Sequence, residues 1–331
     1  MTPPLVEATG LARWFDVTPS LWARLAGEHR LLKAVDGVDF AIRRGETFAL
    51  VGESGCGKST VARLAVGLYA PTKGSIHFDG QDLSLLKDRR RSRALRRRLQ
   101  MIFQDPYASL NPRWRVADIV AEPIRAHGLL AGRRAIADRV GELLTQVGLA
   151  ASDGARFPHE FSGGQRQRIS IARALAGAPE FLVCDEPTSA LDVSVQAQIL
   201  NLMKDLQRSL GLTYLFISHN LAVVFHMADR VGVMYLGRLV EVADVDRLFR
   251  APLHPYTRLL LDTIPDLSMS GKPRGPVAGE VPSPIAPPPG CAFHPRCPLA
   301  QDRCRREAPL ARPRADGGGT VACHAVEEGR A

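Results

Sequence analysis

The sequence predicts an α/β fold with a parallel-sheet core, a helical insertion and a small C-terminal module. Three short apolar runs, FLVCD at 181–185, TYLFI at 213–217 and VGVMY at 231–235, have the composition of buried strands. Apolar residues at helical spacing, from Val195 to Leu210, separate the first two runs. Strands that alternate with helices are typical of a parallel sheet.

The remaining elements follow the same pattern. TFALV at 47–51 is a further apolar run, and after a glycine-rich turn residues 58–68 suit a helix, which predicts a strand–loop–helix unit. From Gln104 to Gly177 the pattern becomes helix-like, notably at 116–126 and 135–147, with no convincing strand. We therefore expect a helical insertion in the α/β domain.

The C-terminal part of the chain has a different composition. From 271 to 290, eleven of twenty residues are Pro or Gly, which disfavours a helix or a central strand and predicts a linker or extended arm. A small cysteine-containing module follows it. The sequence shows no convincing internal repeat, so we expect one α/β domain and not a tandem pair.

Composition limits the function. The chain has a net charge of +9, much of it in KDRRRSRALRRR at 87–98. This run has no aromatic residue to stack on a base, so a solvated surface helix is favoured over a site for nucleic acid or anionic lipid. No stretch approaches the roughly 20 apolar residues of a membrane-spanning helix, and MTPPLVEATG at the start does not resemble a leader peptide. We expect a cytosolic location, where disulfides are disfavoured.

The segment GESGCGKST at 52–60 matches the phosphate-binding loop G-x-x-x-x-G-K-[ST], in the strand–loop–helix context that the motif requires. Its backbone N–H groups and the helix N-terminus would face phosphates; Lys58 would reach the β/γ oxygens, and the Ser59 hydroxyl would bind Mg²⁺. An ordinary glycine-rich turn is the alternative. The predicted ATP-binding residues of the loop are Gly52, Glu53, Ser54, Gly55, Cys56, Gly57, Lys58, Ser59 and Thr60.

Polar side chains follow the predicted strands at their carboxyl ends, where open α/β sheets bind ligands. Asp185 would hold Mg²⁺ with Ser59, and Glu186 would deprotonate the attacking water. His219 is a candidate for sensing the γ-phosphate, and Gln104 for reaching metal or water. Two solvated loop acids are the alternative for Asp185 and Glu186, which the phosphate loop upstream disfavours. For His219 the alternative is a structural role, which is the more common one for a lone histidine.

The segment FSGGQRQRISIARAL at 161–175 places Ser, Gly and Gly directly before a helix-like pattern. SGGQ matches the signature motif of ABC ATPases. It follows Gln104 and precedes Asp185, SALD at 189–192 and His219, in the order that this family has. The chain therefore resembles the ABC ATPases, which hydrolyse ATP with Mg²⁺.

The resemblance implies a P-loop NTPase fold of the ABC type. The nucleotide-binding domain would span 1–250, its helical subdomain about 105–177, and the C-terminal region 251–331. In this family two cassettes pair head to tail, so one subunit's signature closes over ATP in the other's phosphate loop. The signature residues that would act in trans are Ser162, Gly163, Gly164 and Gln165.

Two further residues are assigned by the resemblance. Asp192, in SALD, would lie at the contact between cassettes. Trp14 resembles the aromatic residue that stacks on adenine, and Phe15 is the less favoured candidate for this role. Ordinary core packing is the alternative for Trp14. Phe161 stands where Leu is commonest before SGGQ, and Cys184 where an apolar residue usually precedes the aspartate; neither change removes a catalytic group.

Three stretches narrow the resemblance: MIFQDPYASLNPR at 101–113, LHPYTRLLLDTIP at 253–265 and GEVPSPIAPPPGCAFHPRC at 279–297. They look like the ATP-binding subunits of dipeptide/oligopeptide permeases, the first stretch being closest to the second of their two ATPases. This implies a heterodimer with a sister ATPase, two membrane permeases and an extracytoplasmic solute-binding protein, at the cytoplasmic face of a bacterial membrane. Nickel importers of the same subfamily, and a nucleic-acid-linked ATPase, are the alternatives.

Four cysteines form a pattern near the C-terminus. They are Cys291, Cys297, Cys304 and Cys323, with spacing C-x5-C-x6-C-x18-C. Zinc sites usually begin with closer pairs, whereas some relatives that the chain resembles carry a [4Fe–4S] cluster in this tail. The cluster is therefore favoured, with zinc or free thiols as alternatives. Cys56 and Cys184 are interpreted as packing residues.

Overall fold

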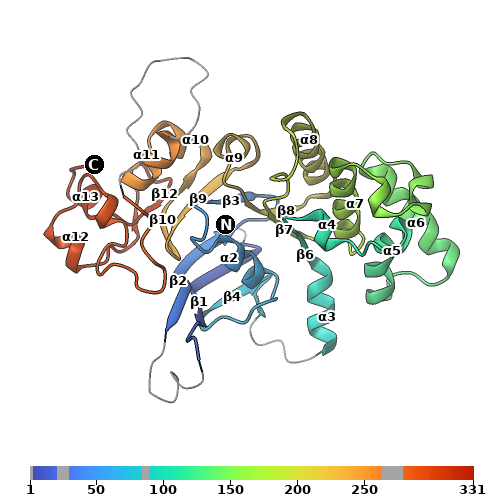
Figure 1. The fold of residues 1–331 in the computed structure, drawn as a ribbon, viewed down its shortest axis with the longest axis horizontal. Helices are drawn as coiled ribbons and strands as arrows, with labels where there is room; N and C mark the ends of the chain where they lie inside the picture. Colours follow the sequence, from blue (N-terminus) through green and yellow to red (C-terminus); the bar gives the residue numbers. More distant parts are fainter. Residues whose placement is uncertain (1–2, 21–29, 84–88, 263–278) are drawn as a thin grey trace.

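The computed structural model describes residues 3–20, 30–83, 89–262 and 279–331. Figure 1 shows the two sheets in the middle of the molecule, the helical region from α4 to α7 on one side and the C-terminal helices α12 and α13 on the other. None of the described helices is long and apolar enough to cross a membrane. The predicted nucleotide site must therefore be located relative to these two sheets.

The larger sheet carries the predicted core. Its strand order is β11-β12-β10-β9-β3-β8-β7-β6, and the pairs β9–β3, β3–β8, β8–β7 and β7–β6 are parallel. The strands of the parallel part are β3 (Thr47–Val51), β6 (Leu99–Ile102), β7 (Phe181–Asp185), β8 (Thr213–Ile217) and β9 (Arg230–Tyr235). The four strands expected from apolar runs are confirmed, because a strand buried on both faces reads as a continuous apolar run.

Two helices follow parallel strands as predicted, α2 (Lys58–Ala65) after β3 and α8 (Val193–Leu210) after β7. Two others were not predicted: α9 (Leu221–Met227) follows β8, and α10 (Val245–Arg250) follows the antiparallel strand β10 (Arg238–Asp244). The helix expected over 58–68 ends earlier, because the Leu68 N–H bonds to the Arg63 carbonyl, a pattern that closes a helix C-terminus. The α8 helix begins where the Asp192 carboxylate accepts a hydrogen bond from the Val195 N–H.

The insertion between β6 and β7 is helical, and residues 105–177, all of them described, contain no strand. Its α-helices are α4 (Pro106–Ser109), α5 (Val116–His127), α6 (Arg133–Gln146) and α7 (Gly163–Leu175). Val120 of α5, Leu143 of α6 and Ile169 of α7 are fully buried in one cluster that continues onto α8 and the sheet. The predicted insertion is confirmed, and it packs against α8 and the larger sheet.

The basic run forms the helix α3 (Arg89–Arg98), while residues 87 and 88 lie outside the described part. Arg93, Arg96 and Arg97 are exposed, whereas Leu95 is buried against the core. Arg98 binds the carboxylates of Glu180 and Asp79. These contacts agree with the interpretation of a solvated surface helix that keeps one apolar side chain inward.

The smaller sheet was not predicted. It has the order β2-β1-β4-β5, with neighbours antiparallel, and consists of β1 (Val6–Asp16), β2 (Leu31–Ile42), β4 (Lys73–Phe78) and β5 (Gln81–Asp82). Register shifts interrupt the β1–β2 pairing after Ala8, Leu11 and Arg13. Each shift moves the next side chains to the other face, so the two-residue period of a half-buried strand is lost from the sequence.

The C-terminal region joins the larger sheet. β12 (Gly319–Val321) pairs antiparallel with β10 (Arg238–Asp244), and β11 (Arg312–Pro313) pairs with β12. Its helices are α11 (Pro255–Asp262), α12 (Asp302–Arg306) and α13 (His324–Glu327). The described part of the predicted linker, 279–290, has no helix or strand, and 271–278 lies outside the described residues. The boundary at residue 250 stays a prediction.

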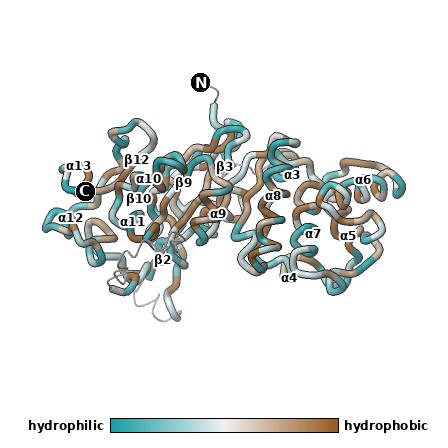
Figure 2. The backbone as a smooth tube through the Cα atoms, turned by 90° about the horizontal axis from the view of Figure 1, so that it is seen from above, coloured by the Kyte–Doolittle hydropathy of each residue, from teal (hydrophilic) through white to brown (hydrophobic). Residues whose placement is uncertain are grey.

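The hydrophobic core is concentrated where the sheets and helices meet. Figure 2 shows brown, hydrophobic stretches along the strands in the middle of the molecule, and teal on the outer helix α12. Cys56 and Cys184 are both buried in core clusters and free, in line with their interpretation as packing residues. Every residue of β3, β7 and β8 is buried, so the strands that lead to the predicted site residues are covered on both faces.

Candidate functional site

The phosphate-binding loop connects β3 to α2 and lies tightly against neighbouring backbone. Gly57 has φ +108°, and a Cβ there would lie 2.0 Å from the Ala34 carbonyl oxygen. Only glycine combines this backbone conformation with so close an approach. Gly57 precedes α2 without a side-chain cap, so N–H groups of the first turn remain open to an anion.

Lys58 points into this loop. Its side chain is largely buried, and its Nζ donates to the carbonyl oxygens of Gly52 at 2.8 Å and Glu53 at 2.9 Å. A buried ammonium is costly unless it is hydrogen-bonded, so the loop carbonyls hold it where phosphate oxygens would come. This position suits the predicted role of Lys58.

Asp185 ends β7 beside the start of α2. The Ser59 hydroxyl donates to Asp185 Oδ1 over 3.0 Å, and the carboxylate is largely buried. Burial raises the pKa of Asp185, an effect that the hydrogen bond from Ser59 partly offsets. A buried carboxylate and a hydroxyl side by side are hard oxygen ligands that suit Mg²⁺, so the residues present fit this ion.

Glu186 follows directly and lies between two other predicted residues. Gln104 Nε2 donates to Glu186 Oε2 over 3.0 Å, and His219 Nδ1 lies 3.2 Å from Glu186 Oε1. The backbone of Glu186 has φ +47° and its N–H donates to the Ile217 carbonyl. A non-glycine residue in this left-handed region is uncommon and clusters at functional sites.

The contact of Gln104 differs from the one that the sequence predicted. Gln104 was expected to reach metal or water, and in this structure its amide is bonded to Glu186. His219 is 64% exposed, so its imidazole can face an incoming ligand as well as Glu186. Four predicted residues, Gln104, Asp185, Glu186 and His219, thus meet at the carboxyl end of the parallel sheet.

The predicted signature forms the start of α7. Ser162 and Gly163 are exposed, and the first turn is closed by a capping box in which Ser162 Oγ accepts from the Gln165 N–H and Gln165 Oε1 accepts from the Ser162 N–H. A Cβ at Gly164 would lie 2.3 Å from Val195 Cγ1 of α8. The exposed N-terminus of α7 is therefore rigid and available to another molecule.

Asp192 lies at the start of α8, with an exposed side chain next to Val193, which is 83% exposed. The hydrogen bond from the Val195 N–H holds the pKa of Asp192 below its usual value. Asp192 therefore has a local capping role in this chain, and its predicted place at a contact between cassettes stays a prediction.

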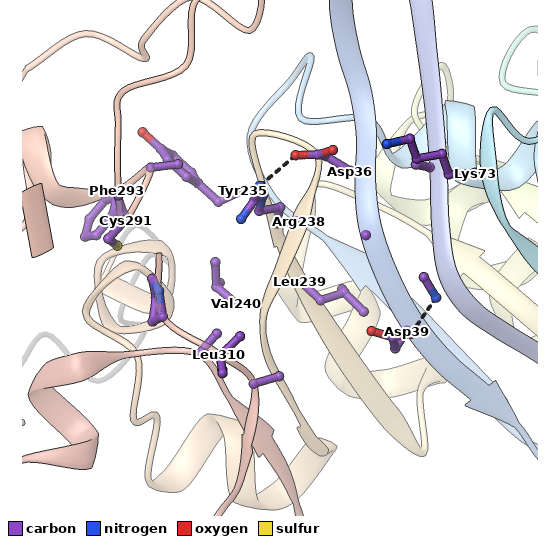
Figure 3. A pocket seen from close by; sticks show the side chains of 18 of the residues that line it. Asp36, Asp39, Lys73, Tyr235, Arg238, Leu239, Val240, Cys291, Phe293 and Leu310 are labelled. Atoms are coloured by element: carbon purple, nitrogen blue, oxygen red, sulfur yellow. Dashed lines mark hydrogen bonds and ion pairs between the residues drawn. The ribbon is translucent and has the colours of Figure 1, made fainter. Parts of the chain in front are cut away.

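Trp14 lies on β1, and its indole N–H donates to Asp36. The ammonium groups of Lys33 and Lys73 lie 5.0 and 4.6 Å from its ring centre. Trp14 lines a pocket of about 400 Å³ together with C-terminal residues such as Cys291. Figure 3 shows Asp36 and Lys73 on one side of this pocket and Cys291 and Phe293 on the other. Adenine stacking by Trp14 stays a prediction.

The alternative aromatic residue has different neighbours. The Phe15 ring meets the Tyr69 ring edge-on, with ring centres 5.6 Å apart, and the Arg13 guanidinium lies 4.8 Å from the Phe15 centre. Phe15 thus packs toward the segment that follows α2. Both aromatic residues are partly exposed.

The four C-terminal cysteines are free and lie near one another. Burial raises the pKa of the Cys291 thiol to about 11, and the Cys291 N–H donates to the Cys304 carbonyl oxygen over 2.8 Å. Among the described residues, no group of three or more His, Cys, Asp or Glu side chains has the arrangement of a metal site. The arrangement supports neither zinc nor an iron–sulfur cluster, and the cluster stays a prediction.

Two residues that contact the phosphate loop were missed. Tyr256 of α11 and Arg296, next to Cys297, both bind Glu53. They are 203 and 243 residues from Glu53 in the chain, and no local motif marks them. Only the folded structure brings them to the loop.

Replacing Lys58 with Met should weaken ATP binding by about 10²-fold, because a charge-assisted contact to phosphate is lost from a site that excludes water. Equilibrium titration of the purified chain with a fluorescent ATP analogue measures the change. Lys204→Met on α8 is the matched control and should bind as the unchanged chain does. Similar affinity for both variants would contradict the assigned position of Lys58.

Comparisons with known proteins agree with this geometry. Residues 35–189 match the family described as ABC transporter, and residues 240–304 the family described as Oligopeptide/dipeptide transporter, C-terminal region. The chain is 49% identical over 323 residues to the oligopeptide transport ATP-binding protein AppF of Bacillus subtilis (strain 168), with 97% of each chain covered. It is also 49% identical over 326 residues to the di/tripeptide transport ATP-binding protein DppF of Pseudomonas aeruginosa (strain UCBPP-PA14), with 98% of each covered.

Solved structures support the same conclusion. The fold matches a dimeric structure of the ATP-binding cassette MJ0796 in a post-hydrolysis state bound to ADP and Pi, with TM-score 0.63 and 26% identity over 72% of this chain and 98% of that one. It also matches cbiO1 from Clostridium perfringens, with TM-score 0.63 and 27% identity over 76% of this chain and 92% of that one. The chain therefore belongs to the ABC transporter family of ATP-binding proteins, carries the C-terminal region of its oligopeptide/dipeptide members, and is an ATPase.

Proposed function

We propose that this ATPase powers the uptake of di- or oligopeptides. The observation that carries the catalytic part is the position of Glu186, whose carboxylate lies between Gln104 and His219 and next to Asp185 in the chain. The peptide part rests on the relatives at 49% identity, which are named as transporters of oligopeptides and of di- and tripeptides. Nickel remains the alternative cargo.

The proposed reaction uses residues of both cassettes in a pair. Lys58 and the loop N–H groups bind the β- and γ-phosphates, and Ser59, Asp185 and Gln104 would hold Mg²⁺. When bound, Mg²⁺ neutralises negative charge on the phosphate oxygens. Glu186 accepts the proton of the attacking water, and Gln104 and His219 orient its carboxylate.

The second cassette completes the site in this proposal. The exposed start of α7, with Ser162, Gly163, Gly164 and Gln165, closes over ATP held by the partner's loop, and Asp192 lies at the contact. Its capping box supports this role, because a preformed helix N-terminus binds an anion without reorganising. ATP thus joins the two cassettes until hydrolysis releases them.

The proposed assembly has five protein components. A sister ATPase pairs with this chain, two membrane permeases form the path, and an extracytoplasmic solute-binding protein delivers the peptide. This assembly is supported by the two relatives at 49% identity, which are transport ATP-binding proteins. The chain then lies peripherally at the cytoplasmic face of the bacterial membrane.

The transport proposal is tested by uptake in cells whose only copy of this subunit is Glu186→Gln. Labelled dipeptide and oligopeptide uptake should fall to background, while labelled nickel uptake, measured in parallel, should not change. Glu142→Gln, an exposed residue of α6, is the control and should transport normally. Loss of nickel uptake alone would show that nickel, and not peptide, is the cargo. Unchanged uptake of both peptide and nickel would contradict the transport proposal.

We also propose that Cys291, Cys297, Cys304 and Cys323 bind a [4Fe–4S] cluster. Four free cysteines in one short C-terminal region support it, since four thiolates are the ligand set of such clusters. Anaerobically purified chain should contain iron and sulfide in equal amounts, and Cys297→Ala should lose both while Cys184→Ala keeps them. Chain without iron and sulfide, or with zinc instead, would contradict the cluster.

A further inference from the structure

The C-terminal region binds the phosphate loop at Glu53 through both backbone and side chain. The Glu53 N–H donates to the Tyr256 hydroxyl over 2.9 Å. Arg296 Nη1 donates to Glu53 Oε2 over 2.7 Å, and Arg296 Nη2 to Glu53 Oε1 over 2.8 Å. Two parallel bonds of this kind fix the orientation of a carboxylate as well as its position.

Arg296 is held in place before it meets the loop. The Arg296 side chain is 3% exposed, and the backbone N–H of Arg296 donates to the Phe293 carbonyl oxygen. The guanidinium carbon lies 5.9 Å from the Tyr235 ring centre and 6.0 Å from that of Phe293, while Tyr235, Tyr256 and Phe293 pack on one another. An arginine preorganised in this way loses little conformational entropy when it binds Glu53.

The same region covers the outer side of the loop. Residues 281–284 line a pocket of about 240 Å³ together with Glu53–Cys56 and Tyr235. Residues 281–284 thus lie across a small cavity from the phosphate loop, while Tyr256 and Arg296 contact the loop directly.

We propose that Arg296 and Tyr256 are positioning residues for ATP binding, which hold the phosphate loop in its nucleotide-receptive form through Glu53. Two physical effects follow from their contacts. They raise the fraction of loops that can accept ATP, and the apparent affinity is proportional to that fraction. Arg296 also neutralises the Glu53 carboxylate, which would otherwise repel a triphosphate bound in the same loop.

The test compares ATPase kinetics of the assembled transporter with variants of this subunit. Arg296→Gln should raise the KM for ATP about tenfold while kcat at saturating ATP stays within about twofold, because bound ATP itself restores the loop. Glu53→Gln/Arg296→Gln should have a KM about threefold lower than Arg296→Gln, since the unpaired carboxylate is gone, but still above that of the unchanged transporter, because the paired bonds that hold the loop are missing. A purely structural contact would lower the melting temperature and kcat without this recovery.

Two further variants keep the test independent of folding. Tyr256→Phe removes one hydroxyl from an otherwise unchanged ring and should raise KM about threefold, because the Glu53 N–H loses its acceptor. Arg296→Lys keeps the charge but not the paired bonds and should lie between Arg296→Gln and the unchanged chain. Arg303→Gln is the control within the C-terminal region. It removes the ion pairs of Arg303 with Glu307 and Glu328 and should leave the KM for ATP unchanged.

The proposal is overturned by either of two results. One is an unchanged KM in both Arg296→Gln and Tyr256→Phe. The other is a double variant whose KM is as high as the separately measured effects of Arg296→Gln and Glu53→Gln multiply to, because residues that act on each other are not additive. Titration of the purified full-length variants with an ATP analogue should give the same order of affinities as the KM values.

Discussion

Replacing Glu186 with Gln should lower the ATPase rate of the assembled transporter by about 10²- to 10⁴-fold. Gln keeps the shape of the side chain and can still contact Gln104 and His219, but it accepts no proton from water. The loss therefore falls on the chemical step. Steady-state phosphate release, measured with single-turnover controls, reports it.

ATP binding should survive the same substitution. The contacts of Lys58 and Ser59 do not involve Glu186, so the affinity of the purified variant for an ATP analogue should stay within about threefold of the unchanged chain. Glu142→Gln on α6 serves as the control and should hydrolyse ATP normally. Undiminished turnover in Glu186→Gln would remove Glu186 from the role of base.

Replacing Arg314 with Leu should reduce the free energy of unfolding by about 3–5 kcal/mol. Arg314 binds Glu241, and both side chains are fully buried. Glu241 also accepts hydrogen bonds from the N–H groups of Leu253 and His254, so it would remain buried and charged without its cation. Urea denaturation of the full-length chain, followed by circular dichroism, measures the change.

Two variants show whether the buried charge is the cause. Arg139→Leu breaks an exposed pair with Glu142 on α6 and should cost at most about 1 kcal/mol. Glu241→Gln combined with Arg314→Leu should recover part of the loss, because Gln is neutral and still accepts one hydrogen bond. A loss below about 1 kcal/mol in Arg314→Leu would mean that the pair is dispensable for β10 and β12.

The local elements of this protein were readable from its sequence. β3, β7 and β8 have the bounds of the apolar runs at 47–51, 181–185 and 213–217, because a strand covered on both faces is apolar throughout. The phosphate loop is equally local, since its glycines, Lys58 and Ser59 lie within nine residues. Information of this kind needs no knowledge of distant contacts.

Elements with irregular pairing were not readable. β1 contains register shifts that break the two-residue period, so the smaller sheet had no pattern to reveal it. The Pro- and Gly-rich composition predicted an irregular arm at 271–290, which the described residues 279–290 match. It could not show that residues 281–284 line a pocket together with the phosphate loop.

The site itself divides in the same way. The sequence identified Gln104, Glu186 and His219 one at a time, from their places after apolar strands, and the fold alone brought them within hydrogen-bond distance. Arg296 had no signal of its own, because its partner Glu53 is 243 residues away. Residue types and local periods follow from backbone geometry and burial, whereas contacts between distant segments arise only when the strands and helices pack together.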